Sequence, residues 1–84
     1  MNIEISIYER TNVPKAGGLI AKTLKEGKLV EVVGAGAKHA YAALSVISQA
    51  NQYLKADDPQ SFIATEHFFE EAGKVRFKLY WDHS

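Results

Sequence analysis

Leu29-Val30-Glu31-Val32-Val33, followed directly by Gly34-Ala35-Gly36-Ala37, is the stretch that decides the fold. Its first five residues are apolar apart from Glu31, which is typical of an interior strand covered on at least one face. The four small residues then turn the chain into a helix, which the sequence predicts from about Lys38 to Leu54. A buried strand that runs through a short turn into a long helix indicates a domain of mixed α and β structure.

Before this stretch, the sequence predicts one strand and one helix. Ile3, Ile5 and Ile7 alternate with polar residues, and this period of two marks a half-buried strand. Pro14 suits the first turn of the helix that follows, in which apolar residues recur at helical spacing. Gly27 ends that helix in the way a C-terminal glycine commonly does.

After the second helix, residues 62–69 and 75–81 predict two strands joined by a hairpin loop at 70–74. The resulting order is βαβαββ. Right-handed crossovers then place both helices on one face of a four-stranded mixed sheet. At 84 residues the chain is long enough for one core, so we expect a single α/β (α+β) domain over residues 1–84.

Composition limits the function classes. Ten lysine and arginine residues balance ten acidic residues, so any basic patch must come from local arrangement and not from total charge. The chain has no cysteine, which excludes disulfides and thiolate zinc sites. A secretion signal and a membrane-spanning stretch are not recognisable, so we expect a cytoplasmic protein without a membrane partner.

The second predicted helix carries no formally charged residue from His39 to Leu54. One apolar stripe is expected to face the sheet: Ala40, Ala43, Leu44, Ile47, Ala50 and Leu54. Further apolar side chains lie off this stripe: Tyr41, Ala42, Val46 and Tyr53. A helix that is apolar beyond one face is usually covered on more than one side. We therefore predict a homodimer interface at Tyr41, Val46 and Tyr53, the alternative being a partly exposed alanine-rich helix.

The turn from strand to second helix invites comparison with dinucleotide-binding loops, but His39 occupies a position that must be small in that fingerprint. A weaker hypothesis is a phosphate-approach turn, in which Gly34 and Gly36 expose the backbone and Lys38 adds charge at a helix N-terminus. The alternative is that both glycines only permit a tight turn.

Neither a metal site nor a catalytic set is predicted. His39, His67 and His83 have no second ligand at metal-binding spacing, and the acidic pairs 57–58 and 70–71 lie in predicted turns. The sequence therefore predicts a protein that is not an enzyme and needs no cofactor.

The last predicted strand has two different faces. One face is a row of cations ending in an aromatic: Lys74, Arg76, Lys78 and Tyr80. The other is apolar: Val75, Phe77, Leu79 and Trp81. The cationic row could contact phosphates, with Tyr80 as a stacking surface. The alternative is a solvated strand face paired with Glu66, Glu70 or Glu71 across the hairpin.

Three segments carry a resemblance to a known family: Lys15-Ala16-Gly17-Gly18-Leu19-Ile20-Ala21, Leu24-Lys25-Glu26-Gly27 and Val32-Val33-Gly34-Ala35-Gly36-Ala37. They resemble the stage V sporulation protein S family, which has an Ala-Gly-containing first helix and an Ile-Gly-Ala-Gly-Ala turn into its second helix. The likeness covers nearly the whole chain. That family is similar in turn to Alba, a small dimeric domain that binds chromatin and RNA.

The resemblance implies an Alba-like fold, dimerisation and nucleic-acid binding through five residues: Arg10, Lys15, Lys38, Lys74 and Arg76. The chain departs from Alba in its neutral total charge and in having Arg10-Thr11 where Alba has two lysines. We therefore expect a non-enzymatic homodimer of bacterial regulatory type that contacts DNA or RNA weakly and without sequence preference. The alternatives are a protein-interaction module without nucleic-acid binding and, more distantly, a site for a small phosphorylated ligand at residues 34–38.

Overall fold

The computed structural model describes residues 2–83 and confirms the predicted order of elements. These are β1 (Asn2–Ile7), α1 (Val13–Lys25), β2 (Leu29–Ala35), α2 (Gly36–Asp57), β3 (Phe62–Phe69) and β4 (Lys74–Asp82), with a single 3₁₀ turn at Glu71–Gly73. The strands form one mixed sheet in the order β1-β2-β4-β3. β1 runs parallel to β2, and the other two pairs are antiparallel.

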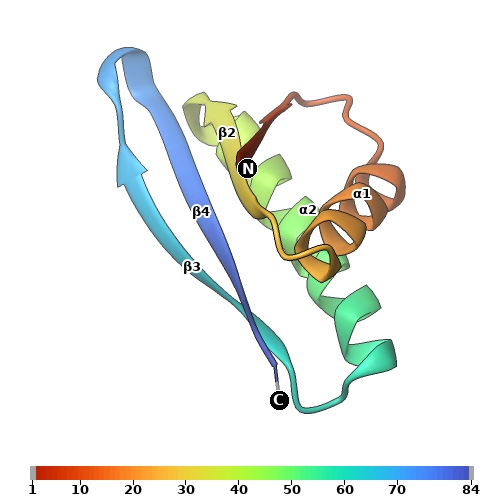
Figure 1. Ribbon diagram of the computed structural model, residues 1–84. Helices are drawn as coiled ribbons and strands as arrows, with labels where there is room; N and C mark the ends of the chain where they lie inside the picture. Colours follow the sequence, from red (N-terminus) through yellow and green to blue (C-terminus); the bar gives the residue numbers. More distant parts are fainter. Residues whose placement is uncertain (1, 84) are drawn as a thin grey trace.

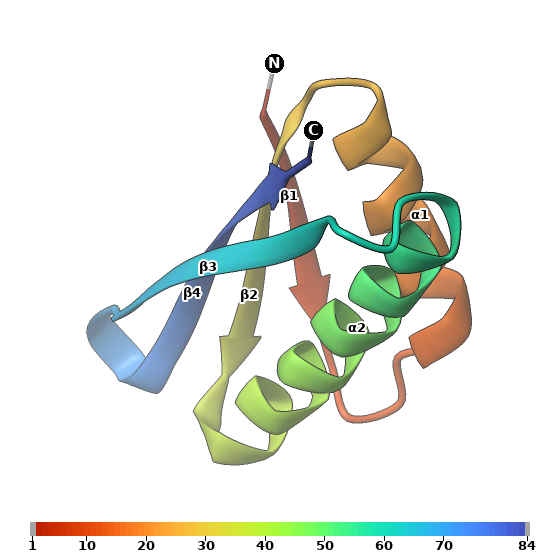
Figure 2. The same ribbon diagram turned by 90° about the horizontal axis from the view of Figure 1, so that it is seen from below.

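Both helices cover the same face of the sheet, as predicted (Figure 1, Figure 2). The core lies between the helices and the sheet. It contains alternate residues of the strands, such as Val32 and Phe77, together with Ile20 and Leu54 from the helices. Each large apolar side chain buried in this way contributes roughly 1.5–3 kcal/mol relative to an exposed one. Within residues 2–83, the opposite face of the sheet has no helix over it (Figure 1).

α1 begins with a capping residue, Asn12, that was not among the predicted features. The Asn12 side chain accepts a hydrogen bond from the backbone N–H of Lys15 at 3.0 Å, and Pro14 lies in the first turn. Further along, a Cβ added to Gly17 would lie 2.9 Å from the Gln49 side chain. A glycine at this point therefore lets α1 and α2 approach each other closely.

The core-facing side of α2 differs in part from the prediction. Its buried residues are Ala43, Val46, Ile47, Ala50 and Leu54. Val46 is therefore a core residue, and its assignment to a dimer interface is wrong, because it is fully buried in the protein's own core. Leu44, expected in the core, is half exposed. The cause is the helical spacing. Val46 lies three residues from Ala43 and next to Ile47 on the core-facing side, whereas Leu44 is rotated by about 100° from Ala43, away from the core.

The β3–β4 hairpin extends beyond the rest of the sheet, and its tip lies away from both helices (Figure 1). The predicted alternation of β4 is confirmed: Val75, Phe77 and Leu79 are buried, whereas Lys74 and Tyr80 are exposed. β3 is an outer strand that pairs only with β4, and only Ile63 of its eight residues is not exposed.

Candidate nucleic-acid interface

Four of the five predicted cations lie at one end of the molecule. The strand register places Ile7, the last residue of β1, beside Gly34, and Ala35, the last residue of β2, beside Lys74. The β1–α1 connection, the end of β2 and the hairpin tip therefore share this end, as both views show (Figure 1, Figure 2). We call the set of four residues at this end the cationic end: Arg10, Lys15, Lys38 and Lys74.

All four side chains of the cationic end are available to a ligand. Each belongs to an exposed residue. Within residues 2–83, none of the four takes part in an ion pair. Exposed cations that no carboxylate neutralises are the groups that a phosphate backbone attracts most strongly.

The connection that carries Arg10 is held against the start of α2. The backbone N–H of Tyr8 donates to the Thr11 hydroxyl at 2.8 Å, and the N–H of Thr11 donates to the Tyr8 carbonyl at 3.1 Å. The Tyr8 and His39 rings then form a T-shaped contact, with 5.9 Å between ring centroids. These contacts, which the local sequence pattern does not predict, place Arg10 and Lys38 on neighbouring parts of one surface.

The start of α2 adds a partial positive charge to this surface. No side chain caps the helix at Ala35, and its first turn contains no acidic residue. The first N–H groups and the helix dipole therefore favour a nearby anion. An open hollow of about 470 Å³ lies here, lined by Glu9, Ala37, Lys38, Tyr41 and Ala42. Glu9 is the one carboxylate among these lining residues, and it limits the positive potential.

The predicted phosphate-approach turn is only partly available. Gly34 is buried, and a Cβ there would lie 2.7 Å from the backbone carbonyl group of His39. Gly34 therefore serves close packing of β2 against α2 and does not face a ligand, so its assignment is wrong. Gly36 lies in open space with φ of +84°, a conformation that favours glycine. The tight-turn alternative therefore accounts for Gly36, and close packing accounts for Gly34.

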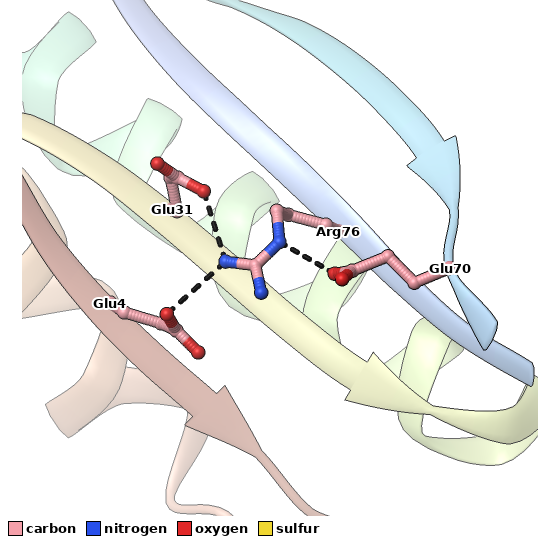
Figure 3. A network of polar contacts seen from close by, with 4 residues as sticks. All are labelled: Glu4, Glu31, Glu70 and Arg76. Atoms are coloured by element: carbon pink, nitrogen blue, oxygen red, sulfur yellow. Dashed lines mark hydrogen bonds and ion pairs between the residues drawn. The ribbon is translucent and has the colours of Figure 1, made fainter. Parts of the chain in front are cut away.

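Arg76, the fifth predicted cation, is occupied by carboxylates on the outer face of the sheet (Figure 3). Its Nε lies 2.6 Å from Glu70, and its Nη1 lies 3.0 Å from Glu31 and 3.2 Å from Glu4. The hydrogen bonds that Arg76 donates to Glu70, Glu4 and Glu31 raise its pKa. Only 19% of the side chain is exposed. Three acids therefore already satisfy Arg76, so the contacts give no support to its assignment to phosphate binding.

Lys78 and Tyr80, which continue the row on β4, both lie near Glu66. Lys78 lies directly beside Glu66 in the strand register, and its ammonium group lies 5.7 Å from the centre of the Phe68 ring. The Tyr80 hydroxyl donates to Glu66 at 2.7 Å, and this bond raises the pKa of Tyr80. Across the hairpin, Glu70 forms an ion pair with Arg76, and Glu66 accepts the hydrogen bond of Tyr80 and lies beside Lys78. The outer face is therefore a mixed-charge surface, as the alternative predicted.

Tyr41 and Tyr53 are the two remaining residues of the predicted dimer interface. Tyr41 is 74% exposed and Tyr53 38% exposed, so both are open to contact. No cluster of three or more His, Cys, Asp or Glu residues suited to a metal is found between residues 2 and 83. In the same range, neither helix has the length and hydropathy needed to cross a membrane.

A scan of protein-family models finds no match to the chain, and a search of curated proteins finds no similar sequence.

Proposed function

We propose that this protein is a non-enzymatic nucleic-acid-binding module that contacts phosphates of DNA or RNA through its cationic end. The observation that carries the proposal is the gathering of four exposed, unpaired cations at one end of the described chain. The uncapped start of α2 supports it, since helix N-termini favour phosphate oxygens. The resemblance to Alba-like proteins supports the same class of partner and a homodimer acting in the cytoplasm.

The expected binding is weak and insensitive to sequence. Ten acids balance ten bases in the whole chain, so attraction comes from the cationic end alone. Contacts with phosphates carry no base information, and such complexes have dissociation constants of about 10⁻⁴ to 10⁻⁶ M at physiological salt. Four phosphate contacts on duplex DNA would give a slope of log affinity against log salt of about −3.6.

A protein-interaction module is the second candidate function. The observation that favours it is the exposure of two large aromatic side chains, Tyr41 at 74% and Phe69 at 79%. Aromatic side chains are enriched at protein interfaces. This function predicts no binding to nucleic acid at any salt concentration.

The test is fluorescence anisotropy with labelled duplex DNA and single-stranded RNA over a range of salt concentrations. Lys38→Gln should weaken binding to all sequences alike and lower the magnitude of the duplex slope by about 0.9. Lys55→Gln is the matched control, because Lys55 is an exposed lysine in the last turn of the same helix. Absence of wild-type binding at low salt, where attraction is strongest, would favour the interaction module.

A further inference from the structure

The outer edge of β3 has backbone groups that the sheet leaves unpaired. The N–H of Ile63 donates to the Asn51 side chain of α2 at 2.9 Å, so residue 63 points its backbone groups away from β4. The N–H of Glu70 donates to the Lys74 carbonyl at 2.8 Å, so residue 70 points toward β4. Strand residues alternate in this respect. Thr65, His67 and Phe69 therefore carry free N–H and C=O groups at the edge.

This edge has few of the features that prevent strands from pairing. Natural sheets protect their edges with lysine, proline or a covering segment. β3 contains no lysine and no proline, and Thr65, His67 and Phe69 are all exposed. Phe69 is the most exposed large apolar residue of the described chain, at 79%. Asn51 covers only the beginning of the strand, at Ile63.

We infer that a second copy of this chain pairs with β3, strand to strand and antiparallel, with His67 on the twofold axis. This deepens, and rests on, the homodimer part of the proposed function. Thr65, His67 and Phe69 each have unpaired backbone groups at the edge. If two identical antiparallel strands use all three residues, the twofold axis must pass beside the middle one, His67. His67 then lies opposite the partner's His67, and Thr65 lies opposite the partner's Phe69. Each such pair exchanges two backbone hydrogen bonds.

Neighbouring registers are less favourable. A register centred on Glu66 would place two glutamates opposite each other, and like charges in that position destabilise a strand pair. A register centred on Thr65 would require the N–H of Ile63, which Asn51 already holds. In the register centred on His67, Glu66 lies opposite the partner's Phe68 and no two like charges meet.

The pairing also determines how the two copies are arranged. The twofold axis is perpendicular to the sheet, so the helices of both copies cover the same face of a joined sheet. Because the strands are antiparallel, the two cationic ends point in opposite directions. The pairing therefore leaves both cationic ends free, and self-association and nucleic-acid binding can be measured separately.

Cysteine cross-linking tests the register, since the chain has no cysteine of its own. With His67→Cys, the two Cα atoms would lie about 5.5 Å apart across the axis, within the range of a disulfide. With Thr65→Cys, the two identical positions would be separated by about 13 Å along the strand. Mild oxidation should therefore link His67→Cys into a covalent dimer and leave Thr65→Cys monomeric. A mixture of Thr65→Cys and Phe69→Cys should link to each other.

Ser6→Cys is the control, because Ser6 is exposed on β1, the opposite edge strand. Proximity across the axis should give His67→Cys at least about tenfold more covalent dimer than Ser6→Cys. Equal linking of these two variants, or linking of Thr65→Cys in place of His67→Cys, would overturn the inference.

A proline variant tests the same contact without a covalent bond. The N–H of His67 points away from β4, so His67→Pro blocks the edge and removes no hydrogen bond within the protein's own sheet. Sedimentation at micromolar concentration should find a wild-type dimer and a monomeric, folded His67→Pro variant. For each subunit, this monomeric variant should show the same slope of log affinity against log salt as the wild type. A monomeric wild type would overturn the inference and would leave the test of nucleic-acid binding unaffected. If His67→Pro does not fold, the pattern of cysteine cross-linking decides the question.

Discussion

Lys74 and Arg76 lie two residues apart on β4 and face the same side of the sheet, yet their surroundings are opposite. Lys74 is exposed and has no ion-pair partner in the described chain. Arg76 is largely covered and contacts Glu4, Glu31 and Glu70 (Figure 3). The comparison shows that a cation's availability to phosphate depends on the neighbouring strands and not on its own position in a basic row.

The strand register explains this difference. Glu4 on β1 lies directly beside Glu31 on β2, so two carboxylates meet on the outer face. Arg76 lies beside Val33, close enough to reach both acids, and Glu70 reaches it from the hairpin. Lys74 lies beside Ala35, where β2 ends and offers no acidic side chain. Lys74, near the strand ends, therefore stays free, whereas Arg76, over the middle of the sheet, is neutralised.

The largest expected effect is on stability and comes from Arg76. Arg76→Met removes the cation and leaves Glu4 and Glu31 side by side, so it should lower the free energy of unfolding by about 1–2 kcal/mol. Lys74→Met should change it by less than about 0.5 kcal/mol, because Lys74 is exposed and unpaired. Urea denaturation of both variants measures the difference. Equal losses would show that the three carboxylate contacts do not stabilise the fold.

A smaller effect concerns the hydroxyl of Tyr80 at alkaline pH. Its hydrogen bond to Glu66 raises its pKa above the ordinary 10.0, so folding favours the neutral phenol. This contribution is fully present below about pH 10 and is lost as the pH rises through the raised pKa. Tyr80→Phe should therefore reduce the loss of stability between pH 9 and pH 12. Unfolding midpoints across that range measure it, and an unchanged alkaline loss in Tyr80→Phe would contradict the prediction.

Local patterns were sufficient to predict the elements, because each depends on nearby residues. The alternation of β4, the turn after β2 and the hairpin loop all follow from short-range spacing. Contacts between distant segments could not be predicted in the same way. The pairing of Arg76 with Glu4 requires the register of three strands, and the burial of Val46 requires the position of α1 against α2. One signal was present in the sequence: Glu31 interrupts an apolar strand and therefore needs a partner.

The slope of log affinity against log salt, measured with duplex DNA for wild type, Lys74→Met and Arg76→Met, tests the central claim most directly. Both variants remove one positive charge from the same face of the same strand. The account predicts that Lys74→Met lowers the magnitude of the slope by about 0.9, whereas Arg76→Met leaves it unchanged within error. A loss of equal size in both variants, or a loss in Arg76→Met alone, would contradict it.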